Sequence, residues 1–196
     1  MFTLPQPSSQ VKALEMDAFE RSFLEAVQRR HDSGSSLDTL GWVYDDGDGA
    51  LRIEDEPDGH TLLYYAARQG WRTATAWLLT RDANVHIGYP SMHMTPLHIA
   101  GFPRQCAVAL LLLEAGARVG AHNRRGQTAL HYAAADGHTN RCKLLLSRGA
   151  SLNETDCYDR DPEASARFLG STDTAEFLAA VRAAGGWRAY CAARQR

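Results

Sequence analysis

Long apolar runs, paired cysteines and a marked excess of either charge are all missing from this sequence of 196 residues. No apolar stretch approaches the roughly 18 residues of a membrane-spanning helix, so we expect no membrane partner. The formal net charge of −2 gives no general attraction to nucleic acid, which is therefore not the expected partner. The first ten residues lack a basic start and an apolar core, so no secretory signal is expected there.

The four cysteines show no paired CxxC spacing. Two of them, Cys106 and Cys142, fall in predicted helices, where a free cysteine behaves as a small buried hydrophobic residue. We therefore expect no disulfide framework, and an intracellular location in the cytoplasm, the nucleus or both.

Recognisable catalytic motifs are also absent. The sequence contains no nucleophile elbow, no P-loop and no dinucleotide-binding fingerprint. Nucleophilic catalysis would need a nucleophile, a base and an orienting group in one pocket, and the scattered His and Cys residues do not indicate one. We therefore predict no catalytic residue, no cofactor and no enzymatic activity.

A four-residue pattern recurs at a nearly constant step. The copies Thr61–Tyr64, Thr95–His98 and Thr128–His131 begin 34 and then 33 residues apart. A leucine-rich stretch follows each copy at the same offset, and a small-residue stop ends each unit. The leading Thr can cap a helix, and the Gly of Gly116-Ala117 and of Gly149-Ala150 suits a helix end.

This pattern resembles the ankyrin repeat, whose period is about 33 residues and whose units open with Thr-Pro-Leu-His. The resemblance implies an all-α fold, a solenoid of stacked helix-turn-helix units with short β-hairpin-like loops. Such a solenoid offers an extended binding surface rather than a catalytic pocket. Two units depart from the pattern: the first has Tyr64 in place of His, and the second has Gly101–Arg104, which we expect to shorten its first helix.

The repeat frame divides the chain into five expected segments. Apolar periodicity over Ala13–Arg30 and Leu37–Val43 predicts two capping helices, and the fading apolar signature after the third repeat predicts a terminal cap. The segments are a leader (1–12), an N-terminal capping helix pair with an acidic loop (13–57), three repeats (58–155, divided as 58–90, 91–122 and 123–155), a degenerate C-terminal capping repeat (156–186) and a basic, aromatic tail (187–196).

The acidic loop and the histidines were the candidates for metal binding. Asp46 and Asp48 have the opening spacing of an EF-hand, but Pro57 stands where the loop needs its final Glu, so a solvated loop able to face a basic partner is predicted. No His or Cys pair has the spacing of a zinc site, and we predict no metal. The histidines that come nearest to a metal site in the repeat frame are His86, His93 and His122.

Two further features leave alternatives open. Trp187 and Tyr190, three residues apart, could pack on the last repeat as a helical lid or form an exposed interface cluster. Asn153 matches a position at which similar ankyrin domains can be hydroxylated by an asparaginyl hydroxylase.

In ankyrin proteins the hairpin tips and the inner faces of the first helices contact the partner, which assigns a candidate surface by position. Its Met-rich and aromatic centre flanked by arginines is typical of protein recognition, although Met92, Met94 and Phe102 could instead fill a gap in the second repeat. The candidates are His60, Arg68 and Gln69, then Met92, His93, Met94, Phe102 and Pro103, and then Arg124, Arg125, Gln127 and Asp136.

These observations predict an intracellular protein–protein interaction module, a scaffold or adaptor that is monomeric by itself. One alternative is a regulatory or targeting subunit of an enzyme complex, in which the acidic loop and the basic tail contact the catalytic partner. Another is a nucleic-acid-associated protein that binds through Arg124, Arg125 and the C-terminal arginines, although the negative net charge opposes it.

Overall fold

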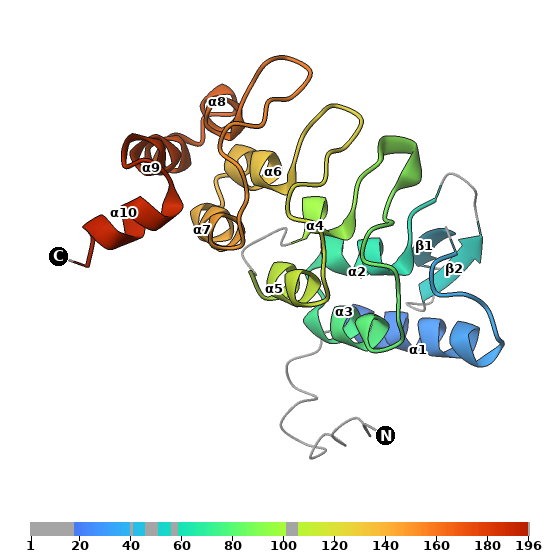
Figure 1. Ribbon diagram of the computed structural model, residues 1–196. Coiled ribbons are helices and arrows are strands. Elements are labelled where there is room, and N and C mark those ends of the chain that lie inside the picture. Colours follow the sequence, from blue (N-terminus) through green and yellow to red (C-terminus); the bar gives the residue numbers. More distant parts are fainter. Residues whose placement is uncertain (1–17, 40, 46–50, 56–58, 101–105, 196) are drawn as a thin grey trace.

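A computed structural model describes residues 18–39, 41–45, 51–55, 59–100 and 106–195 (Figure 1). Over these residues the chain forms an elongated stack of helix pairs, with a β-hairpin near one end and a short helix at the other. The elements are α1 (Ala18–Asp32), β1 (Gly41–Asp45), β2 (Leu51–Asp55), α2 (Leu62–Gln69), α3 (Arg72–Leu79), the 3₁₀-helix η1 (Pro90–Met92), α4 (Pro96–Ile99), α5 (Cys106–Glu114), α6 (Ala129–Ala135), α7 (Thr139–Ser147), α8 (Pro162–Phe168), α9 (Thr172–Ala183) and α10 (Trp187–Ala193).

The helices of the repeats form two rows. α2, α4, α6 and α8 pack side by side in an inner row, and α3, α5, α7 and α9 form the outer row (Figure 1). The loops that join the outer helix of one repeat to the inner helix of the next all project to the same side (Figure 1). The predicted helical solenoid is confirmed, and the short hairpin is the one departure from an all-α fold among the described residues.

One leucine of each outer helix occupies the same buried position. Leu78, Leu112, Leu145 and Leu178 follow one another at steps of 34, 33 and 33 residues, and all four are fully buried. Burying a leucine side chain completely contributes about 1.5–3 kcal/mol. Because Leu178 belongs to this column, the repeat frame continues into α8 and α9, where the apolar signature of the sequence fades.

Threonine residues precede three of the inner helices, and Asp161 caps the fourth, α8. The hydroxyl of Thr61 accepts a hydrogen bond from the backbone N–H of Tyr64, which satisfies one of the free donors of the first turn of α2. Thr95 and Thr128 each share hydrogen bonds with the histidine three residues later. At the other end of α2, Gly70 has a φ of 76°, a left-handed conformation that glycine adopts without steric cost.

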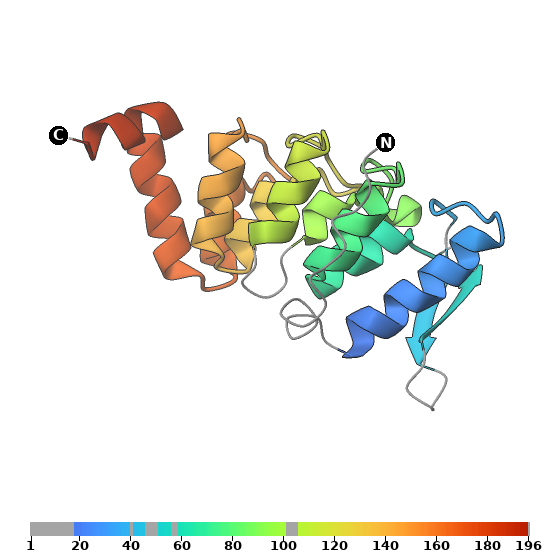
Figure 2. The ribbon, with the colours of Figure 1, turned by 90° about the horizontal axis from the view of Figure 1, so that it is seen from below.

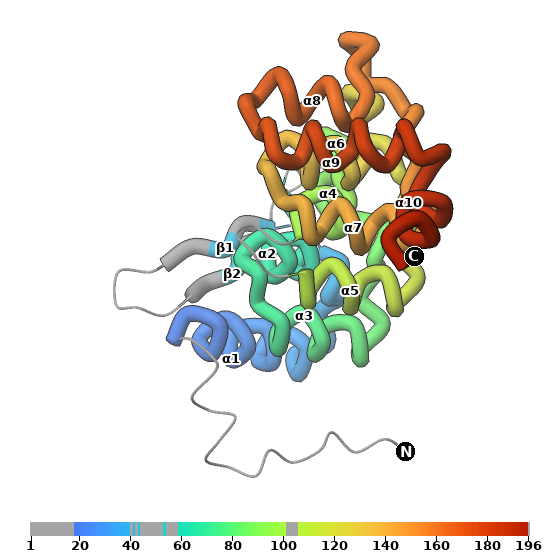
Figure 3. The backbone as a smooth tube through the Cα atoms, turned by 90° about the vertical axis from the view of Figure 1, so that its left-hand side faces the viewer, coloured from blue at the N-terminus to red at the C-terminus, as the bar shows by residue number. Residues whose placement is uncertain are grey.

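The prediction of a second capping helix over Leu37–Val43 is wrong. Residues Gly41–Asp45 form β1, which pairs antiparallel with β2 so that Val43 lies opposite Ile53. Trp42, Val43 and Tyr44 of β1 are aromatic or β-branched residues, which favour a strand, and Ile53 is the one such residue of β2. Figure 2 shows α1 and the hairpin at one end of the stack, and Figure 3 shows α1 beside α3.

Several expectations for this end of the chain fall outside the described residues. The leader and the first five residues of the expected first helix lie there, and α1 runs two residues past the expected end at Arg30. Asp46, Asp48 and Pro57 of the acidic loop are also outside, whereas residues 51–55 of that loop form β2.

The second repeat has the expected short first helix. α4 contains four residues, compared with eight in α2 and seven in α6. It ends at Ile99, immediately before the Ala100 and Gly101–Arg104 segment that replaces the family pattern. Two candidate partner-binding residues of that segment, Phe102 and Pro103, lie outside the described residues.

The C-terminal tail packs on the fourth repeat. The rings of Trp187 and Tyr190 lie 6.3 Å and 5.7 Å from the ring of Phe177 on α9, measured between centroids. α10 also contacts α7. The two tail aromatics are therefore half-buried parts of a lid. No described helix combines the length and the apolar composition needed to cross a membrane.

Candidate functional site

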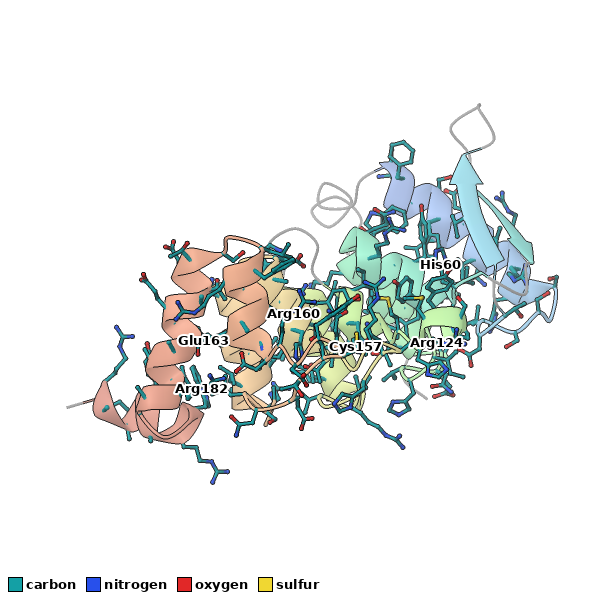
Figure 4. All side chains as sticks on the ribbon, turned by 90° about the horizontal axis from the view of Figure 1, so that it is seen from above. His60, Arg124, Cys157, Arg160, Glu163 and Arg182 are labelled. Atoms are coloured by element: carbon teal, nitrogen blue, oxygen red, sulfur yellow. The ribbon has the colours of Figure 1, made fainter. Side chains whose placement is uncertain are left out.

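The projecting loops are tied to one another by backbone hydrogen bonds. The N–H of Arg124 donates to the carbonyl of Met92 at 3.0 Å, and the N–H of Cys157 donates to the carbonyl of Arg125 at 2.8 Å. Each loop is thus held against the next one along the stack. Side chains on these loops are therefore presented from a frame that is fixed by backbone contacts (Figure 4).

Two histidines reinforce this frame. The Nδ1 atom of His98 accepts a hydrogen bond from the backbone N–H of Thr95, so the ring proton is on Nε2, which donates to the carbonyl of Gln127 at 3.1 Å. His131 repeats the arrangement with Thr128 and the carbonyl of Arg160, also at 3.1 Å. Each imidazole thereby links the start of an inner helix to the next loop.

Burial is the main reason that both imidazoles stay neutral. It lowers the pKa of His98 to about 4, and the hydrogen bonds to the carbonyl groups of Gln127 and Ala121 oppose this only in part. The pKa of His131 is lowered for the same reason. These histidines therefore act as structural hydrogen-bonding groups.

Two of the candidate partner-binding residues are buried, and their expected role at the surface is wrong. His60 stacks on the ring of Tyr64 with a centroid distance of 5.3 Å. The sulfur of Met94 accepts hydrogen bonds from the hydroxyls of Tyr64 at 3.8 Å and Tyr132 at 3.9 Å. Because Tyr64 and Tyr89 surround these positions with aromatic rings, His60 and Met94 fill the interior between loops instead of facing a partner.

The other described candidates divide into exposed and half-buried groups. Gln127 and Asp136 are half-buried and have internal partners: the Gln127 amide nitrogen lies 3.4 Å from Asp156, and the Asp136 carboxylate lies 3.7 Å from Arg141. Met92 is half-buried. The exposed candidates are Arg68, Gln69, His93, Arg124 and Arg125.

The fourth repeat carries surface residues that were not among the sequence candidates. A hollow of about 270 Å³ lies between α6 and α8, and its lining includes Arg125, Arg160 and Phe168. The 33-residue step could have found this region, because it maps Arg125, Gln127 and Asp136 onto Tyr158, Arg160 and Leu169. Only the candidate partner-binding residues end at the third repeat, because the apolar signature of the predicted capping repeat is weak.

The three histidines that were candidate metal ligands do not form a cluster in the described part of the chain. His86 and His93 are exposed, and His122 lies 3.1 Å from the carboxylate of Glu154. In the described part of the chain, no three His, Cys, Asp or Glu side chains form a group that could hold a metal ion. Burial raises the pKa of the Cys142 thiol to about 12, so that cysteine is an interior packing residue.

Comparison with known proteins agrees with this architecture. A family model described as ankyrin repeats, in three copies, matches residues 23–123 and again 104–184. The chain belongs to the ankyrin-repeat family. Ankyrin repeats generally serve as protein–protein interaction modules.

Individual relatives match only parts of this chain. It is 33% identical over 129 residues to the nuclear factor NF-kappa-B p105 subunit of Mus musculus, and 31% identical over 107 residues to a putative ankyrin repeat protein of Acanthamoeba polyphaga mimivirus. These matches cover 64% and 55% of the chain, but only 13% and 14% of the relatives. Diacylglycerol kinase iota of Mus musculus is 40% identical over 58 residues, which are 30% of the chain and 6% of the relative.

Proposed function

We propose that this protein is a scaffold or adaptor that binds a partner protein through its projecting loops and its inner helix row. The observation that carries the proposal is the backbone tie between loops, from Arg124 to Met92 and from Cys157 to Arg125. A frame fixed in this way lowers the conformational entropy that a binding surface loses when a partner docks. The exposed side chains of Arg124 and Arg125 stand on that frame.

The proposal treats the protein as a binding module without catalytic activity, metal or cofactor, and as monomeric by itself. An intracellular setting suits the four free cysteines, one of which, Cys157, is exposed on a loop. Arg68, Gln69 and His93 extend the surface toward the first repeats, and the fourth repeat extends it at the other end.

Site-specific cross-linking in cells tests the position of this surface. A photoreactive phenylalanine analogue would replace Arg124 on a loop or, as the control, the exposed Asn140 on the outer helix α7. We expect a cross-linked protein from the Arg124 position and much less product from the Asn140 position. Equal yields from both positions, or no product from either, would contradict binding through the loops.

A second candidate is a regulatory or targeting subunit of an enzyme complex. It is favoured by the similarity of 58 residues of the chain to a segment of diacylglycerol kinase iota, which is named as an enzyme. The same photoreactive residue in place of Arg188 on α10 would test it, because the basic tail is the expected contact. Identification of the cross-linked protein as a catalytic chain would support this role, and a non-catalytic product would favour the scaffold.

A further inference from the structure

The fourth repeat exposes an unusual amount of apolar surface. Tyr158, Phe168 and Leu169 are 62%, 70% and 61% exposed, and they lie within twelve positions of one another. Of the described residues, only two further large hydrophobic side chains are exposed, Phe19 and Ile87. Single exposed hydrophobic residues are common, but a group of them rimmed by polar residues marks an interaction site.

Arg160 joins this apolar group to the hollow between α6 and α8. Its guanidinium lies 4.6 Å from the ring centre of Tyr158 and 4.7 Å from that of Phe168. Its Nε and Nη2 atoms donate to the Asp156 carboxylate at 3.2 Å and 2.9 Å. These contacts fix the guanidinium, while its Nη1 donors have no acceptor among the described residues.

The ion pairs of this repeat point their positive ends outward. The Arg160 side chain is 25% exposed and its partner Asp156 is fully buried, whereas Arg167 is 61% exposed and its partner Glu163 is 14% exposed. Figure 4 shows Arg160, Glu163 and Arg182 at this end of the stack. The arginines therefore form the outer ends of these ion pairs, each compensated by a carboxylate behind it, and the exposed Asp159 adds a negative charge on the same loop.

Arg125 is the exception to this compensation. It lines the same hollow from the preceding loop, it is exposed, and within the described residues it forms no ion pair. One uncompensated cation beside apolar rings suits a single carboxylate next to an apolar side chain. A nucleic acid presents a closely spaced row of phosphates and gains affinity from several uncompensated cations, whereas Arg125 is the one arginine in the described lining of the hollow that forms no ion pair.

The wall of the hollow also contains Asp136 and Ser165. The Asp136 carboxylate lies 3.7 Å from Nη2 of Arg141, which compensates its charge from the interior. The hollow of about 270 Å³ is smaller than usual pockets for drug-sized ligands, so it fits one or two side chains.

We propose that the hollow between α6 and α8 binds an extended peptide segment that carries a carboxylate side chain beside a bulky apolar one. The carboxylate pairs with Arg125 and the Nη1 donors of Arg160, and the apolar side chain packs on Phe168 and Leu169. The inference rests on the proposed function, because it names the chemistry of the partner at one part of that surface.

Selection from a displayed library of random peptides of about 12 residues tests this chemistry. The targets are the wild-type chain, Phe168→Ala and Arg125→Glu; the controls are Phe19→Ala, an exposed aromatic on α1, and Arg72→Glu, an exposed arginine on α3. Circular dichroism verifies that all five proteins are folded.

We expect enrichment of sequences with Asp or Glu next to Phe, Leu, Ile, Tyr or Trp. Recovery of these peptides should fall about tenfold or more on Phe168→Ala and Arg125→Glu, the loss typical of one interface anchor. Recovery on the two control variants should match the wild type.

A double-mutant cycle with the best enriched peptide then tests the carboxylate contact. Replacing its Asp or Glu by the amide should weaken binding to the wild type about tenfold, but should strengthen binding to Arg125→Glu, because the amide removes the repulsion from the introduced carboxylate. Enriched peptides without a carboxylate, equal recovery on Arg125→Glu, or no enrichment at all would overturn the proposal. A labelled single-stranded oligonucleotide is tested on the same proteins. If it bound more tightly than the best peptide, and Arg125→Glu abolished that binding, the surface would be assigned to nucleic acid instead.

The two proposals fail in different ways. Cross-links from the Arg124 position without peptide enrichment would refute the acidic-peptide site and leave the binding function standing. Failure of both experiments would refute both proposals.

Discussion

The carboxylate of Glu20 accepts a hydrogen bond of 2.8 Å from the backbone N–H of Ala74, which lies 54 residues further along the chain. Ala74 is the third residue of α3, and the residue before that helix, Trp71, supplies no side-chain cap. Glu20 belongs to α1 and is buried. The N-terminal helix therefore caps a helix of the first repeat from outside it, and a negative charge there also suits the helix dipole.

Removal of this contact should loosen the junction between α1 and the first repeat. We expect Glu20→Ala to lower the free energy of unfolding by about 1–3 kcal/mol, because the donor of Ala74 would stay buried without its partner. Glu20→Gln keeps an acceptor and should lose less. Urea unfolding followed by circular dichroism measures both, and Glu25→Ala, an exposed change on the same helix, is the control. An equal effect of the Glu25 and Glu20 changes would disprove the cap.

The column of buried leucines gives a second prediction. Leu145→Ala should lower the free energy of unfolding by about 2–5 kcal/mol, because it opens a cavity between Leu112 and Leu178 in the seam between repeats. Its neighbour Leu144 is only partly buried, so Leu144→Ala should cost clearly less. Chemical denaturation of the two variants makes the comparison. A loss below about half a kcal/mol for Leu145→Ala would mean that this helix face is misplaced.

The buried histidines predict that the protein loses stability in mild acid. The pKa of His98 is lowered from 6.5 to about 4, so the unfolded chain takes up a proton at a higher pH than the folded one. The stability contribution of neutral His98 is complete above pH 6.5 and is lost as the pH falls toward 4. The expected loss from this residue is about 3 kcal/mol. The lowered pKa of His131 acts in the same direction.

Urea unfolding at a series of pH values between 7 and 4 measures this dependence. His98→Gln removes the titrating group, so its free energy of unfolding should fall less steeply with pH than that of the wild type. NMR titration of the imidazole signals provides a direct check that needs no variant. A His98 pKa near 6.5 in the folded protein would contradict the buried, neutral state.

The repeat period predicted those parts of the fold that recur. A 33-residue step identifies the environment of Leu145 from that of Leu112, and the environment of His131 from that of His98, because each repeat meets the same neighbours. The β-hairpin around Val43 has no counterpart in other repeats, so the period carried no information about it. There the strand preference of the individual residues indicated the correct structure, whereas the apolar spacing wrongly indicated a helix.

The candidate site was predicted less well than the fold. The position of a residue in the family motif does not predict whether neighbouring side chains bury it. His60 and Met94 are buried by tyrosines from two repeats. The fourth repeat was predicted as a cap, but its surface residues were not predicted as part of the site, for the opposite reason. Its outward side chains, Tyr158 and Phe168, break the consensus, and departures from the consensus are where a repeat protein places its specific contacts.

The interior position of Met94 leads to the last prediction. Met94→Ala should lower the free energy of unfolding by about 2–5 kcal/mol, because the thioether fills the space between Tyr64 and Tyr132. Tyr64→Phe removes only the weak O–H···S bond and should cost less than about 1 kcal/mol. Met92→Ala, at a half-buried loop position, is the matched control. It should lower the free energy of unfolding much less than Met94→Ala does. If Met94→Ala left the stability unchanged but abolished cross-linking from the Arg124 position, Met94 would be a contact residue after all, and its assignment to the interior would be wrong.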